Sequence, residues 1–254
     1  MRSLWRHEPS IPVRIYIDAP SRVHLGEWGI PDRADASLEI VDHREPTYSW
    51  ADKPLALIDH DPRRERVLLL DTDTRVCGPI DDVFALLDRF ELAAAHAPVR
   101  LGRGQPASLT ARAPKAFPEL NTGVIAYRKT SAVAQLFERW WALHEEIFRS
   151  GDHPDIGDQA TFRAALYESN VRFTVLPPEF NCRFTMPTYV HGPVRILHGR
   201  ASDLGRIERA INGSTGGRVF VPGLGVVRAP GKDKRRLSKR GSPTRRSYRP
   251  HSEI

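Results

Sequence analysis

The sequence has few cysteines, no long apolar run and no internal repeat. Its two cysteines, Cys77 and Cys182, lie far apart and outside the spacings of metal ligands, which argues against a disulfide framework and a zinc module. The apolar runs are much shorter than the roughly 20 residues that a membrane-spanning helix needs. The first residues, MRSLWRHEPS, lack the apolar core of a secretory signal. We therefore expect a globular protein of the cytoplasm.

Positive charge is concentrated in the C-terminal segment 228–254. This segment has 10 Lys and Arg against 2 Asp and Glu, whereas the preceding residues have 28 against 29, so the net charge of +7 belongs to the tail. The segment is rich in Pro, Gly and Ser, which predicts a disordered tail after a single domain at 1–227. Such a tail can aid solubility, or it can attract the protein to an anionic membrane surface or to RNA. A peripheral place at the membrane and a nucleic-acid-associated protein are therefore alternatives.

Apolar periodicity predicts alternating strands and helices. This alternation is typical of an α/β domain with a mixed, mostly parallel sheet that helices cover on both faces. In the longest helix, Ser131 is the expected N-cap, and 67–70 is expected to be a strand buried on both faces. Strands are expected at 11–18, 38–41, 67–70, 92–98, 121–128, 171–177 and 194–198. Helices are expected at 52–60, 79–90, 131–151 and 158–170, with an irregular surface loop at 100–118.

Two aspartates, Asp71 and Asp73, follow directly after the apolar run VLLL. Ligands of α/β sheets bind beyond the carboxyl ends of the strands, and residues i and i+2 of an extended chain point the same way. The pair can hold Mg²⁺ or Mn²⁺ whose other positions take water and phosphate oxygens, or it can simply end a strand in water. Phosphatases of the haloacid dehalogenase type also have D-x-D after a strand, but Arg75 stands where they have Thr or Val.

The order of several short motifs resembles that of the GT-A glycosyltransferases. Lys53 is followed by LDTDT, FPELNTGVIAYR, GDQATF, LPPEFNCRF and RILHG, over about residues 3–200. The order is most similar to the glycogenin-like and bacterial galactosyltransferase-like group. The resemblance implies a GT-A fold, which is Rossmann-like, and transfer of a sugar from a nucleotide-diphosphate donor to an acceptor (a glycan, a lipid-linked molecule or a protein). It leans towards retention of the anomeric configuration.

The resemblance also implies roles for individual residues. Asp71, Asp73 and His198 match the metal ligands, and the imidazole favours Mn²⁺ over Mg²⁺. The remaining matches concern the donor. Asp158 and Gln159 match the catalytic pair that grips the donor sugar, and Asn121, Thr122 and Gly123 match the turn that lines the sugar pocket. Lys53 matches a lysine that contacts phosphate or sugar. Asp18, at the carboxyl end of the strand expected at 11–18, is placed to contact the nucleotide or to stabilise the sheet edge.

Two features depart from the family pattern. The chain starts as if at the end of the first helix, so the first strand and part of the base pocket are expected to be missing. After His198 the family's Gly-x-x-Lys-Pro-Trp is replaced by HGRASD, so its lysine for the diphosphate has no counterpart. A catalytically inactive GT-A-like remnant that binds or scaffolds is therefore the alternative function.

Overall fold

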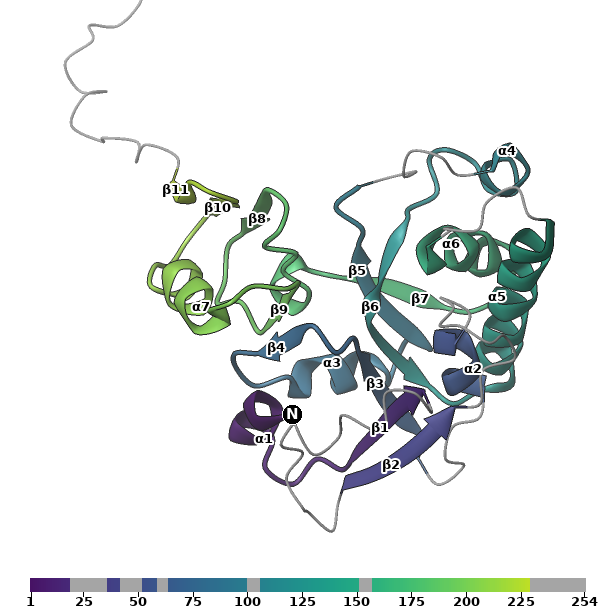
Figure 1. Cartoon of the computed structure of the whole chain (residues 1–254), viewed down its shortest axis with the longest axis horizontal. Coiled ribbons are helices and arrows are strands. Elements are labelled where there is room, and N and C mark those ends of the chain that lie inside the picture. The colour runs from purple at the N-terminus through teal and green to yellow at the C-terminus, as the bar shows by residue number, and fades with distance from the viewer. Residues whose placement is uncertain (19–35, 42–51, 59–63, 100–105, 151–156, 229–254) are drawn as a thin grey trace, which may run out of the picture.

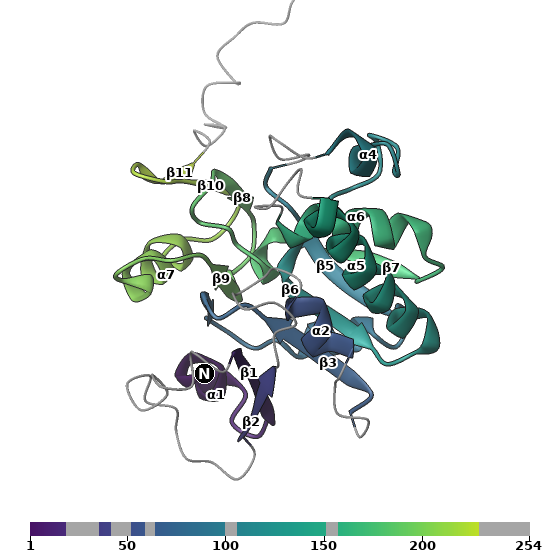
Figure 2. The same ribbon diagram turned by 45° about the vertical axis from the view of Figure 1, so that its right-hand side comes forward.

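The chain folds around a mixed four-stranded sheet with helices on both faces (Figure 1, Figure 2). This computed structural model describes residues 1–18, 36–41, 52–58, 64–99, 106–150 and 157–228. In chain order the elements are α1 (Arg2–His7), β1 (Val13–Asp18), β2 (Ala36–Val41), α2 (Asp52–Ile58), β3 (Arg66–Leu70), β4 (Thr74–Val76), α3 (Asp81–Leu86), β5 (Leu92–His96), α4 (Ala107–Thr110), β6 (Leu120–Arg128), α5 (Ser131–Ser150), α6 (Asp158–Glu168), β7 (Phe173–Leu176), the 3-10 turn η2 (Pro178–Phe180), β8 (Thr188–Val190), β9 (Ile196–His198), α7 (Leu204–Asn212), β10 (Arg218–Val221) and β11 (Gly225–Arg228).

The strand order of the main sheet is β3-β6-β5-β7. Strand β6 runs antiparallel to β3 and to β5, and β7 runs parallel to β5, so three strands share one direction and β6 opposes them. The predicted α/β class with a mixed sheet is therefore confirmed. Three smaller groups of strands surround this sheet, namely the parallel pair β1-β2, the antiparallel pair β4-β9 and the antiparallel sheet β11-β10-β8.

Two apolar cores lie on opposite faces of the sheet. One core packs α2, α4, α5 and α6 against one face, and Val67 and Leu69 of β3 join it. The other packs α1 and α3 against the opposite face, and Leu68 and Leu70 join that one. Both faces of β3 are covered, as expected, but the strand is only half-buried because it is the outer strand of the sheet among the described residues.

Helix α5 has the predicted apolar stripe but a different cap. The N–H of Val133 donates to Oγ1 of Thr130 at 3.2 Å, so Thr130 caps the helix, and the expectation of a cap at Ser131 is wrong. The side chain of Trp140 is fully buried, and its Nε1 donates to the main-chain oxygen of Asp158 at 3.0 Å. This bond ties the start of α6 to α5.

A third, smaller core organises the C-terminal part. Cys182, Phe184 and Leu197 pack with residues of β8, α7 and β10. This part carries β9 alongside β4, so it brings the end of β9 to the edge of the main sheet (Figure 1).

Some expectations need correction or are not tested. The segment 100–118, expected to be an irregular loop, contains α4, whose Leu109 is buried.

The two cysteines are both free thiols, and burial raises the pKa of each to about 12. Among the described residues, no helix combines the length and the apolar character needed to cross a bilayer. Residues 229–254 of the predicted tail, 151–156 and 100–105 lie outside the described residues.

Candidate metal and donor site

The turn between β3 and β4 holds two acidic side chains in a fixed place. The carbonyl oxygen of Asp71 accepts hydrogen bonds from the N–H and the hydroxyl of Thr74, at 3.1 and 2.7 Å. The chain then enters β4, which pairs with β9 so that Thr74 lies opposite His198. The short turn and this strand pairing together place Asp73 beside an imidazole that is distant in the sequence.

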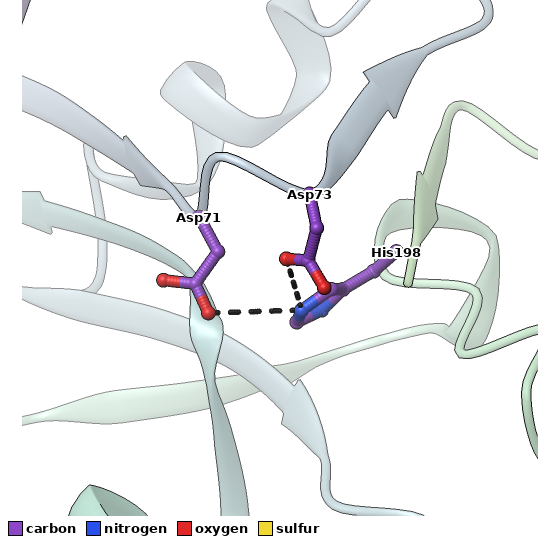
Figure 3. Close-up of side chains that lie close together, drawn as sticks. All are labelled: Asp71, Asp73 and His198. Carbon is purple, nitrogen blue, oxygen red and sulfur yellow. Dashed lines mark ion pairs between the residues drawn. The ribbon is translucent and has the colours of Figure 1, made fainter. Parts of the chain in front are cut away.

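The three predicted metal ligands converge on one point (Figure 3). Nε2 of His198 lies 3.3 Å from Oδ1 of Asp73 and 3.6 Å from Oδ2 of Asp71. The imidazole is almost completely buried, whereas both carboxylates are about a quarter exposed. One ligand atom from each residue lies within 4.8 Å of the others, and this donor set of two carboxylates and one imidazole suits Mn²⁺ or Mg²⁺.

Lys53 of α2 joins this cluster to the start of α6. Its Nζ lies 2.9 Å from Oδ1 of Asp71 and 2.6 Å from Oδ2 of Asp158. Burial alone would lower the pKa of Lys53, but attraction to Asp158 and Asp71 outweighs it and raises the pKa above its usual value. The residue therefore stays charged. Burial also raises the pKa of Asp71, which Lys53 only partly offsets. The carboxylate of Asp158 thus pairs with Lys53 and does not cap its helix, whose N-cap is Gly157.

A row of hydrogen-bonded side-chain amides runs from Gln159 to the imidazole of His198. Asn121 donates to Oε1 of Gln159 at 2.6 Å, and Asn181 donates to Oδ1 of Asn121 at 2.8 Å. Oδ1 of Asn181 lies 2.9 Å from Nδ1 of His198. All but Gln159 are buried, so these contacts bind the predicted sugar residues and the predicted metal ligand into one unit.

Arg183 lies against the imidazole of His198. Its Nη1 is 2.7 Å from Nε2 of His198, and its Nε is buried without a hydrogen-bond partner among the described residues. Beyond it lies a pocket of about 250 Å³, hereafter the adjoining pocket. Residues that line the adjoining pocket include His96, Asn181, Arg183, Pro187, Thr188 and Tyr189.

The sequence prediction located most of the cluster but missed two members. Lys53, Asp71, Asp73, Thr122 and His198 lie together, and Asn121, Gly123, Asp158 and Gln159 contact members of the same cluster. The main chain of Asp18 ends β1 opposite Val41 of β2, its side chain lies outside the described part of the structure, and its contact with a nucleotide stays a prediction. The roles of Asn181 and Arg183 were missed, although both lie within the quoted motif LPPEFNCRF.

Comparison with solved structures identifies glycosyltransferases that resemble this chain. Neither a family model nor a curated protein matches the chain. Mouse xyloside xylosyltransferase 1 in its apo form matches 77% of this chain and 90% of its own, with a TM-score of 0.50 and 16% identity. The galactosyltransferase LgtC, solved with donor and acceptor sugar analogs, matches 79% of this chain and 81% of its own, with a TM-score of 0.45 and 16% identity. The chain has the GT-A fold.

Proposed function

We propose that this protein is a metal-dependent glycosyltransferase that uses a nucleotide-diphosphate sugar. One observation carries the proposal: two carboxylates and a buried imidazole converge at the end of β3, next to the Lys53–Asp158 ion pair. The GT-A fold of the chain is consistent with it.

The charges of the site favour a divalent cation together with an anionic donor. Asp71, Asp73 and Asp158 supply three negative charges, and Lys53 and Arg183 supply two positive ones. A divalent ion turns this balance positive, which is the sign that a diphosphate needs. When bound, Mn²⁺ or Mg²⁺ would stabilise the negative charge that develops on the departing diphosphate. Asp71, Asp73 and His198 would hold the ion.

Other side chains would orient the donor. Asn121 uses its Oδ1 and one N–H in the row, so its second N–H can donate to a sugar hydroxyl. Gln159 uses its Oε1 in the row, and its amide nitrogen can donate to the sugar as well. Asp158, fixed by Lys53 and by the bond from Trp140 to its main chain, would contact the sugar near the reacting carbon. Such positioning accelerates the reaction because less entropy is lost in reaching the transition state.

Besides the metal ion, Arg183 is the candidate for a contact to the diphosphate. The Gly-x-x-Lys-Pro-Trp motif is replaced in this chain, so its lysine has no counterpart, yet Arg183 has a buried Nε–H without a partner among the described residues. A guanidinium beside the metal ligands can donate to phosphate oxygens in a fixed geometry. We assign it to the leaving group.

The adjoining pocket is the candidate for the acceptor. It shares Asn181 and Arg183 with the site, and its volume of about 250 Å³ suits a single sugar ring rather than a large ligand. Tyr189, 58% exposed, offers a ring on which a sugar can stack. Asp71 and Asp158 pair with Lys53 and Asp73 lies beside His198, so each carboxylate already has a partner, which fits transfer with retention better than a role as general base.

The alternative is a GT-A-like protein that binds without catalysis. One contact favours it, because Nη1 of Arg183 already occupies the imidazole nitrogen that a metal would need. Titration of UDP in the presence of Mn²⁺ separates this alternative, since a protein that has lost the donor site should take up no nucleotide saturably.

The proposal is tested by hydrolysis and transfer assays with a panel of nucleotide sugars and Mn²⁺. At least one donor should be turned over, and turnover should vanish in the double variant Asp71→Asn/Asp73→Asn. Asp82→Asn is the matched control, because Asp82 is an exposed acid in the first turn of α3. Undiminished turnover in the double variant would refute the metal assignment.

A further inference from the structure

The row of amides that ends at His198 has a definite orientation. Every contact in the row joins a donor to an acceptor, and one member is a main-chain N–H that can only donate. The N–H of Gly123 lies 3.2 Å from the side-chain oxygen of Asn121. The atom of Asn121 that faces it must therefore be Oδ1, and Nδ2 must be the atom that faces Gln159.

The orientation of Asn121 determines that of Asn181. Since Oδ1 of Asn121 also faces Asn181 at 2.8 Å, the facing atom of Asn181 must be its Nδ2. Asn181 then turns Oδ1 towards Nδ1 of His198, at 2.9 Å. A carbonyl oxygen only accepts, so Nδ1 of His198 must carry the proton.

The second imidazole nitrogen is consequently free to accept. A neutral imidazole has one N–H, so a proton on Nδ1 leaves a lone pair on Nε2. An independent contact agrees, because Arg183 has no acceptor and its Nη1 lies 2.7 Å from Nε2. Nε2 is therefore the acceptor nitrogen of the imidazole, and it lies 3.6 and 3.3 Å from the carboxylates of Asp71 and Asp73, so a metal held by them would compete with Arg183 for its lone pair.

We propose that Asn181 is a positioning residue that sets the tautomer of His198, so that Nε2 keeps a lone pair for the metal centre. Without this acceptor, the proton would move to Nε2, where the carboxylate of Asp73 can accept it. That tautomer cannot bind a metal through Nε2. The burial of Asn181 (4% exposed) and His198 (1% exposed) excludes competing water from the contact.

The same row couples metal binding to the sugar residues. Any shift of Asn181 moves Asn121, and Asn121 holds Gln159 at 2.6 Å. The functional consequence rests on the proposed metal centre and donor site. The tautomer itself is a property of the metal-free chain, so it is measured separately from catalysis.

The first test is the tautomer of His198 in the full chain at pH 8 without metal, read from long-range ¹H–¹⁵N correlations of the imidazole. The resonance is assigned with His198→Gln. Wild type should show the proton on Nδ1, and a proton on Nε2 would overturn the proposal. This measurement needs no variant of Asn181, so it does not depend on how such a variant folds.

The second test measures Mn²⁺ affinity by electron paramagnetic resonance. Asn181→Leu should move the proton to Nε2 and weaken Mn²⁺ binding about 10- to 100-fold, the usual effect of losing an outer hydrogen bond to a ligand. Asn181→Asp keeps the acceptor for Nδ1 of His198 but loses the donor to Oδ1 of Asn121, so it should preserve the tautomer of His198. Unchanged tautomer and affinity in Asn181→Leu would overturn the proposal.

Asn212→Leu is the matched control. Asn212 also bonds through both atoms of its amide, to the main chain of Val194, but it lies outside the site. Its loss should lower stability without changing the tautomer or the Mn²⁺ affinity. If no nucleotide sugar is turned over while these results hold, the proposed function fails and the role of Asn181 stands.

Discussion

Gly123 lies directly against His198. A Cβ at position 123 would be 1.9 Å from Cε1 of the imidazole and 2.8 Å from Oδ2 of Asp71. No side chain can occupy that space unless the imidazole moves. The glycine thus fixes how closely β6 approaches the metal ligands.

Gly123→Ala should therefore displace the imidazole and weaken Mn²⁺ binding by at least about 10-fold, since metal sites tolerate little ligand displacement. Calorimetric titration with Mn²⁺ measures this effect. Gly192→Ala is the control, because its nearest neighbour would be Cγ of Glu179 at 3.9 Å, and its affinity should equal that of wild type. Equal affinities for both variants would contradict the close approach.

Lys53→Met should destabilise the metal-free protein. The substitution leaves the buried carboxylate of Asp158 and the partly buried carboxylate of Asp71 without their shared cation, and losing one partner of a buried pair costs about 3 kcal/mol. Urea unfolding at pH 8 measures the change. Lys115→Met, at an exposed lysine, should cost little, and a similar cost for both would refute the structural role of Lys53.

The protein should lose stability in mild acid partly through His144. Burial lowers the pKa of His144, although Asp158 and Asp52 oppose this effect. The unfolded chain then binds a proton below its ordinary pKa of about 6.5, while the folded chain does not, so stability is lost as the pH falls. The slope for one proton is at most about 1.4 kcal/mol per pH unit.

His144→Gln should reduce that slope between about pH 7 and pH 5, as measured by urea unfolding at a series of pH values. His191 is exposed, so His191→Gln should retain the slope of wild type. If His144→Gln has the same slope as wild type, the buried imidazole is not responsible.

Tyr189→Ala should separate transfer from donor hydrolysis. If the adjoining pocket receives the acceptor, loss of the exposed ring should lower transfer about 10-fold or more, because stacking contacts are worth over about 1 kcal/mol. Hydrolysis of the donor should stay within about twofold of wild type, since Tyr189 contacts none of the metal ligands. Tyr189→Phe should restore transfer, and equal losses of both activities in Tyr189→Ala would argue against the assignment.

The sequence predicted those parts of the site whose structure follows from the local pattern of residues. The apolar run before Asp71 marks a strand end, and the stripe along α5 marks a helix that packs on the sheet. The strands β8, β10 and β11, which the sequence did not predict, have only three or four residues each, too few for a periodic pattern. The contacts of Asn181 and Arg183 with His198 depend on Cys182 pairing with Leu197 of β9, a contact that no local pattern encodes.

Binding of Mn²⁺ to the full chain is the most direct test of the central claim that Asp71, Asp73 and His198 form a metal site. Electron paramagnetic resonance of a Mn²⁺ titration should show one bound ion per chain in wild type and none in Asp71→Asn/Asp73→Asn, with Asp82→Asn unchanged. Absence of bound Mn²⁺ in wild type, or equal binding in the double variant, would contradict the claim.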